Sequence, residues 1–164
     1  MYAFHKNRHK LVLDKTDIRI LDILQTNAEM QVNHIATKVF KSPSSTHERI
    51  RKLEEKGVIK RYVAVLDRWL VGRPTLVVVM VQLKEHGIDI LHEFAHKMTG
   101  YPEVQFCLHL SGEFDFVLHL TLIDSQEYDE FLELKLCAHP MVHKVQSSFV
   151  LKEFKSMAAL PLVL

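Results

Sequence analysis

Apolar positions in the first quarter of the chain recur every three or four residues, the spacing that places side chains on one face of a helix. The first block predicts a helix over residues 15–26, with Asp14 as a candidate N-cap and Asp17 at the reciprocal capping-box position. A second block starts at Val32 and predicts a shorter helix that ends near Val39. The N-terminal part of the chain is therefore expected to be helical.

A third helix is indicated by the residues that would begin and end it. Ser42 is a candidate N-cap, Pro43 occupies the first helical position, where a missing N–H costs least, and Gly57 follows as a C′ glycine. The expected buried stripe consists of Thr46, Ile50 and Leu53. Residues 58–66, VIKRYVAVL, then predict a short strand or wing. Three short helices followed by a wing predict a winged helix-turn-helix, whose third helix enters the major groove of DNA.

The second half of the chain changes its hydrophobic period. β-Branched, nearly continuous apolar runs predict buried strands, and helical spacing returns only in two stretches. The expected order is a strand at 75–84, a helix at 88–98, strands at 104–110 and 114–122 around a turn at Ser111 and Gly112, a helix that Ser125 caps and that runs to about Leu136, and a strand at 142–154. This βαββαβ order is ferredoxin-like with an antiparallel sheet, so the whole chain is expected to be α+β.

Charge divides the chain at the same place. Residues 1–66 hold 13 Lys and Arg against 7 Asp and Glu, a net +6, whereas residues 67–164 hold 8 against 13, a net −5. The changes of period and charge, with Gly72 and Pro74, predict a domain of residues 1–66, a linker at 67–74 and a second domain at 75–164. The basic domain is expected to bind a polyanion.

No apolar run reaches the about 18–20 residues that a membrane span requires. The basic first ten residues lack the following apolar stretch of a signal peptide, so a cytoplasmic location is expected. Cys107 and Cys137 form no CxxC pair and are expected to be buried, reduced thiols.

Candidate DNA contacts follow from the expected place of the third helix. Its N-terminal polar side chains are expected at base edges, and nearby cations at phosphates and at guanine. The first group comprises Ser42, Ser44, Ser45 and His47, and the second Arg49, Arg51, Lys52, then Lys60 and Arg61 on the wing, and Lys6, Arg8 and Lys10 on the basic arm. The alternative is a solvated helix face with ion pairs such as Glu48 with Lys52.

Three stretches carry a resemblance to a known family. They are LDKTDIRILDILQTNAEMQVNHIATKV, SPSSTHERIRKLEEKGVIKRY and the later turn SGEFDF. Together they resemble the Lrp/AsnC, or feast/famine, transcription regulators over about residues 13–155. The resemblance implies a homodimer through the βαββαβ domain, often assembled into octamers, that binds pseudo-palindromic promoter sites. It also implies no enzymatic activity and no cofactor.

The resemblance further implies an amino acid or similar small effector, bound between subunits near the glycine turn. The matching residues here are Gly112, Phe114 and Asp115, with Ser147 nearby on the last strand. A glycine turn lets backbone amides approach an effector carboxylate, and Asp115 is a candidate acceptor for its ammonium group. The alternative is a plain hairpin in which these residues serve only the fold.

Two positions depart from the family pattern. Phe40 stands where many relatives have Gly in the turn before the recognition helix, and a phenylalanine resists a left-handed conformation, so the turn is expected to differ locally. Val145 stands where relatives often have Thr, which removes a hydroxyl near the expected pocket. An effector-independent local regulator or an architectural DNA-compacting protein therefore stays open as an alternative function.

A rival pattern is His92-Glu93-Phe94-Ala95-His96, which matches HExxH on an expected helix. This motif alone would indicate a zinc hydrolase, but a third ligand and a substrate cleft are lacking in the pattern, and we expect surface histidines instead. His109 and His119 lie on adjacent expected strands, where they would be able to face each other. The C-terminal SMAALPLVL is apolar and is expected to pack between subunits.

Overall fold

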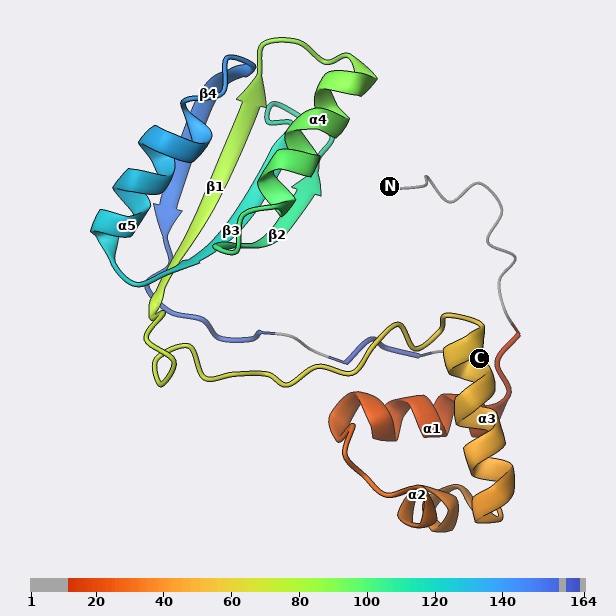
Figure 1. Cartoon of the computed structure of the whole chain (residues 1–164). Coiled ribbons are helices and arrows are strands. Elements are labelled where there is room, and N and C mark those ends of the chain that lie inside the picture. The colour runs from red at the N-terminus through yellow and green to blue at the C-terminus, as the bar shows by residue number, and fades with distance from the viewer. Residues whose placement is uncertain (1–11, 157–158, 163–164) are drawn as a thin grey trace. The chain divides into compact units, whose positions relative to one another are not determined.

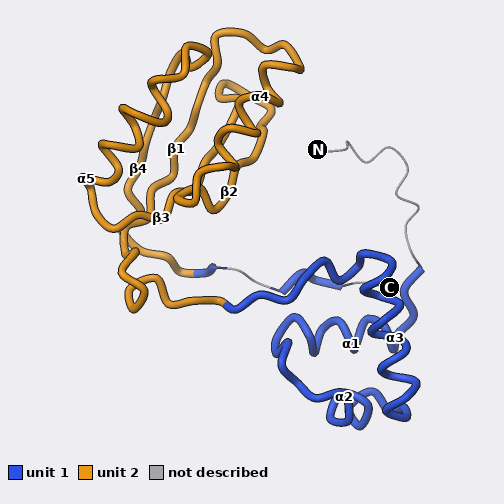
Figure 2. The backbone as a smooth tube through the Cα atoms, in the orientation of Figure 1, with its two compact units in different colours: residues 1–64, 155–164 blue, residues 65–154 orange. Residues whose placement is uncertain are grey.

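The computed structural model describes residues 12–156 and 159–162 of the chain. It divides into two compact units, which Figure 2 distinguishes by colour. The first comprises residues 1–64 with 155–164, and the second residues 65–154. Residues 155–164 are thus grouped with the first unit, whereas the pattern of the sequence assigned residues 75–164 to the second domain.

The first unit is built from three helices, α1 (Lys15–Thr26), α2 (Val32–Val39) and α3 (Pro43–Glu55), as Figure 1 shows. The Asp14 carboxylate accepts hydrogen bonds from the backbone N–H groups of Thr16 and Asp17, and the Asp17 carboxylate accepts one from the N–H of Asp14. This capping box satisfies N–H groups that have no partner within the helix. The expected bounds of α1 and its cap are confirmed.

The turn between α2 and α3 is left-handed despite its phenylalanine. Phe40 has φ 57° and ψ 47°, so the expectation that the turn would depart from this conformation is wrong. The physical reason is the hydrogen bonding of the turn: Phe40 N–H donates to the Thr37 carbonyl at 3.3 Å, and Lys41 N–H to the Ala36 carbonyl at 3.0 Å. These bonds satisfy carbonyls at the end of α2 and hold Phe40 in place.

The caps of α3 agree with the sequence. The Ser42 hydroxyl accepts a hydrogen bond from Ser45 N–H at 3.2 Å, Pro43 is the first helical residue, and Gly57 has φ +68°. The helix then ends as expected. Residues 58–66, however, form no strand within the chain and run as irregular backbone, because no described segment pairs with them. Of the two expectations for this stretch, a short strand or a wing, the strand is therefore not formed among the described residues of the single chain.

One hydrophobic cluster holds the first unit together. Its buried members come from all three helices and are Ile20, Leu21, Ile35, Val39, Ile50 and Leu53. The C-terminal segment joins this cluster, since Leu162 packs against it. In addition, the Gln25 side chain donates to the Leu160 carbonyl at 3.3 Å and accepts from its N–H at 2.6 Å. In the single chain, the segment expected to lie between subunits is thus attached to the helix-turn-helix unit.

The second unit has the expected βαββαβ order. Its elements are β1 (Thr75–Leu83), α4 (Ile88–Thr99), β2 (Val104–His109), β3 (Phe116–Leu122), α5 (Ser125–Glu130), which continues as the π-helix η1 (Phe131–Leu136), and β4 (Val142–Phe149). The strands form one antiparallel sheet in the order β2-β3-β1-β4. The helix α4 and the helix formed by α5 and η1 cover the same face of this sheet and form one helical layer (Figure 1). The ferredoxin-like α+β architecture is confirmed.

The N-cap of α5 and the end of the last strand differ from expectation, and four other element ends differ by one or two residues. The N-cap of α5 is Asp124 rather than Ser125, because the Asp124 carboxylate accepts from the N–H groups of Gln126 and Glu127, both at 2.9 Å. The last strand ends at Phe149 rather than at residue 154. Its pairing with β1 stops there, with a final hydrogen bond from Val150 N–H to the Leu76 carbonyl. No described helix of the chain is long and apolar enough to cross a membrane.

Alternation along the strands separates a covered face from an open one. The covered face packs β1 and β3 side chains, such as Val79 and Leu118, against Phe94 and Phe131 of the helical layer. The opposite face carries no described helix, and we call it the open sheet face. Its members, identified from the strand register, are Val78, Met80, Phe106, Leu108, Val117 and His119. Phe106 and Leu108 are 50% and 54% exposed.

The same register corrects the expectation for the two strand histidines. His109 is opposite Phe116, whose side chain lies on the covered face, and stacks on its ring with a centroid distance of 5.2 Å. His119 is opposite Phe106 on the open sheet face. Successive residues of β3 point to opposite faces, so Phe116 and His119, three residues apart, lie on different faces. His109 shares the face of Phe116 and therefore does not face His119.

Candidate DNA-binding surface and effector site

The N-terminal end of α3 presents polar groups at the surface of the first unit. Every residue from Phe40 to Ser45 is exposed, between buried Val39 and buried Thr46. We call residues 40–45 the exposed turn segment. The positive end of the helix dipole at this point favours a bound anion.

The candidate base contacts lie together on this surface. Ser42, Ser44 and Ser45 belong to the exposed turn segment, and His47 is exposed one residue after buried Thr46. The hydroxyl oxygens of Ser42 and Ser44 are 3.2 Å apart and share a hydrogen bond. These side chains are short and carry donors and acceptors, which suits an approach to base edges.

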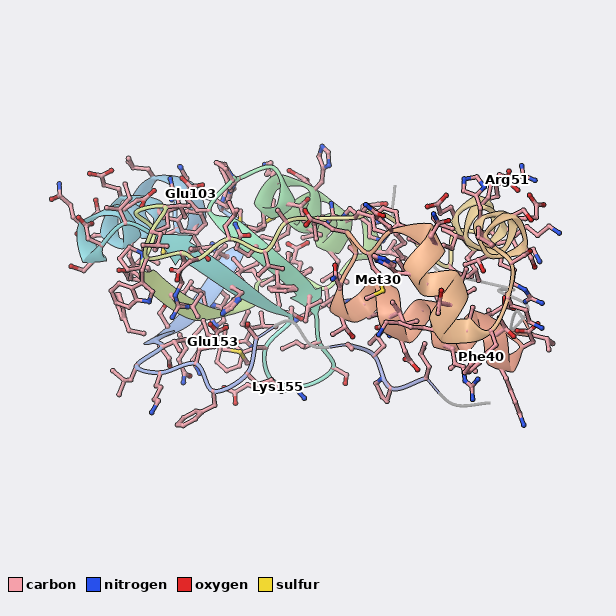
Figure 3. The ribbon with its side chains drawn as sticks, turned by 90° about the horizontal axis from the view of Figure 1, so that it is seen from below. Met30, Phe40, Arg51, Glu103, Glu153 and Lys155 are labelled. Carbon is pink, nitrogen blue, oxygen red and sulfur yellow. The ribbon has the colours of Figure 1, made fainter. Side chains whose placement is uncertain are left out.

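Cations follow on the next two turns of α3. Arg51 is half exposed and pairs with Glu48 at 2.9 Å and Glu55 at 2.6 Å (labelled in Figure 3). Lys52 lies 3.4 Å from Glu48, so the ion pair of the alternative interpretation is present. Such exposed pairs contribute little to stability and exchange readily for a phosphate. Lys60 and Arg61 are exposed as well, whereas Lys6, Arg8 and Lys10 lie outside the described residues.

Arg49 is placed differently from the other cations. Its guanidinium donates to the carboxylates of Asp14 and Asp17, both at 2.7 Å, and its side chain is only 30% exposed. Backbone N–H donation from Asp17, and then Arg49 itself, hold the pKa of the Asp14 carboxyl below its ordinary value. Arg49 therefore joins α3 to the start of α1, and we assign it a structural role within the unit.

The lowered pKa of Asp14 predicts a pH dependence. A carboxyl with a depressed pKa in the folded state stabilises the fold above its unfolded pKa, and this stabilisation is lost as pH falls. We expect the thermal midpoint of the first unit to decrease when the pH is lowered below about 4, which is near the unfolded pKa of Asp. The measurement compares wild type with Asp14→Asn, which keeps a capping oxygen without the charge. The difference between their midpoints should shrink from pH 6 to pH 3, and a constant difference would contradict the assignment.

The predicted effector residues on the glycine turn are tied to the end of β1. Asp115 is 8% exposed. Its carboxylate accepts a hydrogen bond from Leu83 N–H at 2.7 Å and lies 3.2 Å from His86 Nε2. Gly112 has φ +145°, a conformation that favours glycine. The Phe114 ring lies under the Lys144 ammonium at 5.1 Å. Asp115 thus anchors the turn through hydrogen bonds that the sequence pattern did not reveal.

Ser147 lies at a different place, in an open cavity beside β4. The Tyr128 hydroxyl forms a hydrogen bond with the Ser147 hydroxyl at 2.6 Å. The cavity has a volume of about 510 Å³ and is lined by Tyr128, Leu132, Cys137, Val142, His143, Val145 and Ser147. The single chain therefore does not bring Ser147 into one pocket with Gly112, Phe114 and Asp115. Tyr128 was missed because only packing of α5 on the sheet brings it to β4.

The histidine and cysteine groups form no metal centre in the described part of the chain. His92 and His96 are exposed on α4, and Glu93 pairs with Lys97 at 2.9 Å. Among residues 12–156 and 159–162, no three His, Cys, Asp or Glu side chains are grouped to hold a metal ion. Both cysteines are free. Burial raises the pKa of the Cys107 thiol to about 11.

Cys137 corrects one expectation, because it is exposed rather than buried. It is the C-cap of η1, where the chain leaves the helical layer, and only its N–H is used, in a hydrogen bond to the Leu132 carbonyl at 2.7 Å.

A trihelical DNA-reading unit joined to a ferredoxin-like domain defines a class of DNA-binding transcription regulators. Residues 13–60 match the family model for a winged helix-turn-helix DNA-binding domain, and residues 76–160 match that for the Lrp/AsnC ligand-binding domain. The chain belongs to the Lrp/AsnC family of transcription regulators, which are not enzymes.

Individual relatives agree along nearly the whole chain. The leucine-responsive regulatory protein of Haemophilus influenzae is 35% identical over 150 residues, which cover 92% of this chain and 90% of that protein. A transcriptional regulator of Neisseria meningitidis, solved as an L-Met complex, is 35% identical with a TM-score of 0.86, covering 92% of this chain and 97% of its own. An AsnC family regulator of Agrobacterium tumefaciens is 34% identical with a TM-score of 0.86, covering 91% and 97%.

Proposed function

We propose that this regulator reads the major groove with the N-terminal end of α3. The observation that carries the proposal is the exposed turn segment, which places several hydroxyls beside the positive end of the recognition helix. The proposed base contacts are Ser42, Ser44, Ser45 and His47, and the proposed phosphate contacts are Arg51, Lys52, Lys60 and Arg61. Arg49 is omitted because its guanidinium is engaged by Asp14 and Asp17. A protein that binds genomic DNA in this way would be located in the cytoplasm, associated with the nucleoid.

Replacing Arg51 by Ala is expected to weaken DNA binding and flatten its salt dependence. Each phosphate contact contributes about 0.9 to the slope of log affinity against log salt, so a dimer with two Arg51 side chains should lose about two. The measurement is a titration of duplex DNA, selected by the wild-type protein from a random-sequence library, at several salt concentrations. Arg19→Ala is the matched control, since Arg19 is also exposed but lies on α1. Equal losses of affinity and slope in both variants would show that the effect arises from the net charge of the protein and not from a contact of Arg51.

The homodimer, and the octamer beyond it, belong to the same proposal. The open sheet face leaves the apolar side chains of Phe106 and Leu108 exposed in the single chain, and Met80 is half-buried between them and β4. Residues 61–66 add further exposed apolar side chains, among them Val65 and Leu66. Burying such surfaces between copies of the chain favours assembly. Two copies would then read the two halves of a pseudo-palindromic promoter site.

For the effector we propose an amino acid or a related small molecule. A relative 35% identical to this chain was solved as an L-Met complex. The candidate contacts are the turn with Gly112, Phe114 and Asp115, and the Ser147 hydroxyl in the cavity beside β4. Because these two places are separate in the single chain, a complete effector site requires a neighbouring subunit.

A thermal-shift panel of the twenty amino acids tests the effector. A ligand that binds only the native state adds about 2.7 kcal/mol at a concentration of 100 Kd, so the correct amino acid should raise the melting temperature by several degrees. Ser147→Ala should reduce the shift, while the control Ser125→Ala, at an exposed position of α5, should not. If no amino acid shifts the wild-type protein, the alternative holds: an effector-independent local regulator or an architectural DNA-compacting protein.

A further inference from the structure

Phe40 is a large apolar residue in a place where the fold gains nothing from it. Its side chain is 83% exposed, and its backbone has φ 57° (Phe40 is labelled in Figure 3). It is the only non-glycine residue with positive φ among the described residues. A β-carbon disfavours this conformation, and an exposed ring regains no burial energy in return. Glycine would close the same turn without either disadvantage.

The position of Phe40 connects it with the surface that reads DNA. It begins the exposed turn segment and is two residues before Ser42, the N-cap of α3. Consecutive Cα atoms are about 3.8 Å apart, so the Phe40 Cα is at most about 7.6 Å from that of Ser42. This corresponds to about two base-pair steps of 3.4 Å along a duplex. Lys41, which lies between them, is a cation that is exposed as well.

We propose that Phe40 is a specificity-determining DNA contact, whose ring touches the 5-methyl group of a thymine beside the bases that α3 reads. The thymine methyl is the apolar group that the major groove offers, and phenylalanine is among the side chains suited to it. A strained, exposed conformation that the fold does not need is typical of residues kept for binding. Sequence-specific recognition by this regulator then includes a thymine in each half-site.

The first experiment separates stability from binding. Phe40→Gly relieves the backbone strain, so the melting temperature of the first unit is expected to rise by about 4–8 °C. Affinity for a duplex selected by the wild-type protein from a random-sequence library is expected to fall at least tenfold. Gly57→Ala is the control, because it introduces strain at φ +68° at the opposite end of α3. It should lower the melting temperature and leave the affinity of the folded protein unchanged. Unchanged affinity of Phe40→Gly would overturn the proposal.

The second experiment identifies the contacted group on the DNA. Each thymine of the selected duplex is replaced in turn by deoxyuridine, which lacks the 5-methyl group. At one symmetric pair of positions, we expect wild-type affinity to fall about fourfold per half-site, or about fifteenfold for both. The same replacement should not weaken Phe40→Gly further, whereas it should weaken Arg51→Ala as much as wild type. Equal sensitivity of wild type and Phe40→Gly at every thymine would overturn the contact. Failure of the wild type to select any duplex would instead overturn the proposed DNA-reading surface, and this contact with it.

Discussion

A Met80→Asp substitution on the open sheet face is expected to convert the assembled protein into monomers and to lower its affinity for the selected duplex at least 100-fold. Met80 lies in the middle of β1, opposite Val117 and Gln146. A carboxylate there would be buried without a partner in the proposed interface, which is strongly unfavourable. Losing the second subunit removes the gain from two linked half-site contacts, about 10²–10⁴ in affinity.

Sedimentation velocity measures the assembly, and circular dichroism checks that the variant is folded. Leu134→Asp is the matched control, since Leu134 is 71% exposed on η1, away from the open sheet face. This control should keep the dimer and the DNA affinity of wild type. A Met80→Asp protein that remains a dimer would show that the subunits meet through another surface.

The second large effect is expected from Ile20→Ala in the core of the first unit. Ile20 is fully buried between the three helices. Removing its side chain should destabilise the unit by about 2–5 kcal/mol. A unit of this size has a total stability of only about 4–11 kcal/mol, so the substitution removes a large share of it and raises the unfolded fraction of the unit at 37 °C. Specific DNA binding should then be lost.

The second unit should survive this substitution, because its buried cluster contains none of the same residues. Calorimetry is expected to show a lower unfolding temperature for the first unit and an unchanged one for the second. Sedimentation should still show the wild-type assembly. Ile20→Val is the control and should lower the free energy of unfolding of the first unit by only about 0.5–1.5 kcal/mol. A single transition that moves as a whole would contradict the independence of the two units.

The helix ends of the first unit were predictable because the forces that set them are local. The capping box of Asp14 and Asp17 spans three residues, and Ser42 with Pro43 begins α3 through contacts with its own first turn. A reader of the sequence sees every partner in such interactions. The candidate base contacts are likewise neighbours on one helix end, so their common exposure follows from the same local signals.

The role of Arg49 was not predictable in the same way. Its partners Asp14 and Asp17 are 35 and 32 residues away in the chain, and only the packing of α3 on α1 brings the charges together. The same holds for Tyr128 and Ser147, which are joined by the packing of α5 against β4. The spacing of charged or polar residues in a sequence carries no information about such contacts.

The sequence by itself determined the family, the order of elements and the basic character of the DNA-reading unit. These properties follow from hydrophobic period, caps and motifs, all of which are short-range. Only the tertiary structure decided that His109 and His119 lie on opposite faces, that Asp115 anchors β1, and that Leu162 packs on the helix-turn-helix core. Strand register and packing bring distant segments together, and one residue of register reverses the face on which a side chain lies.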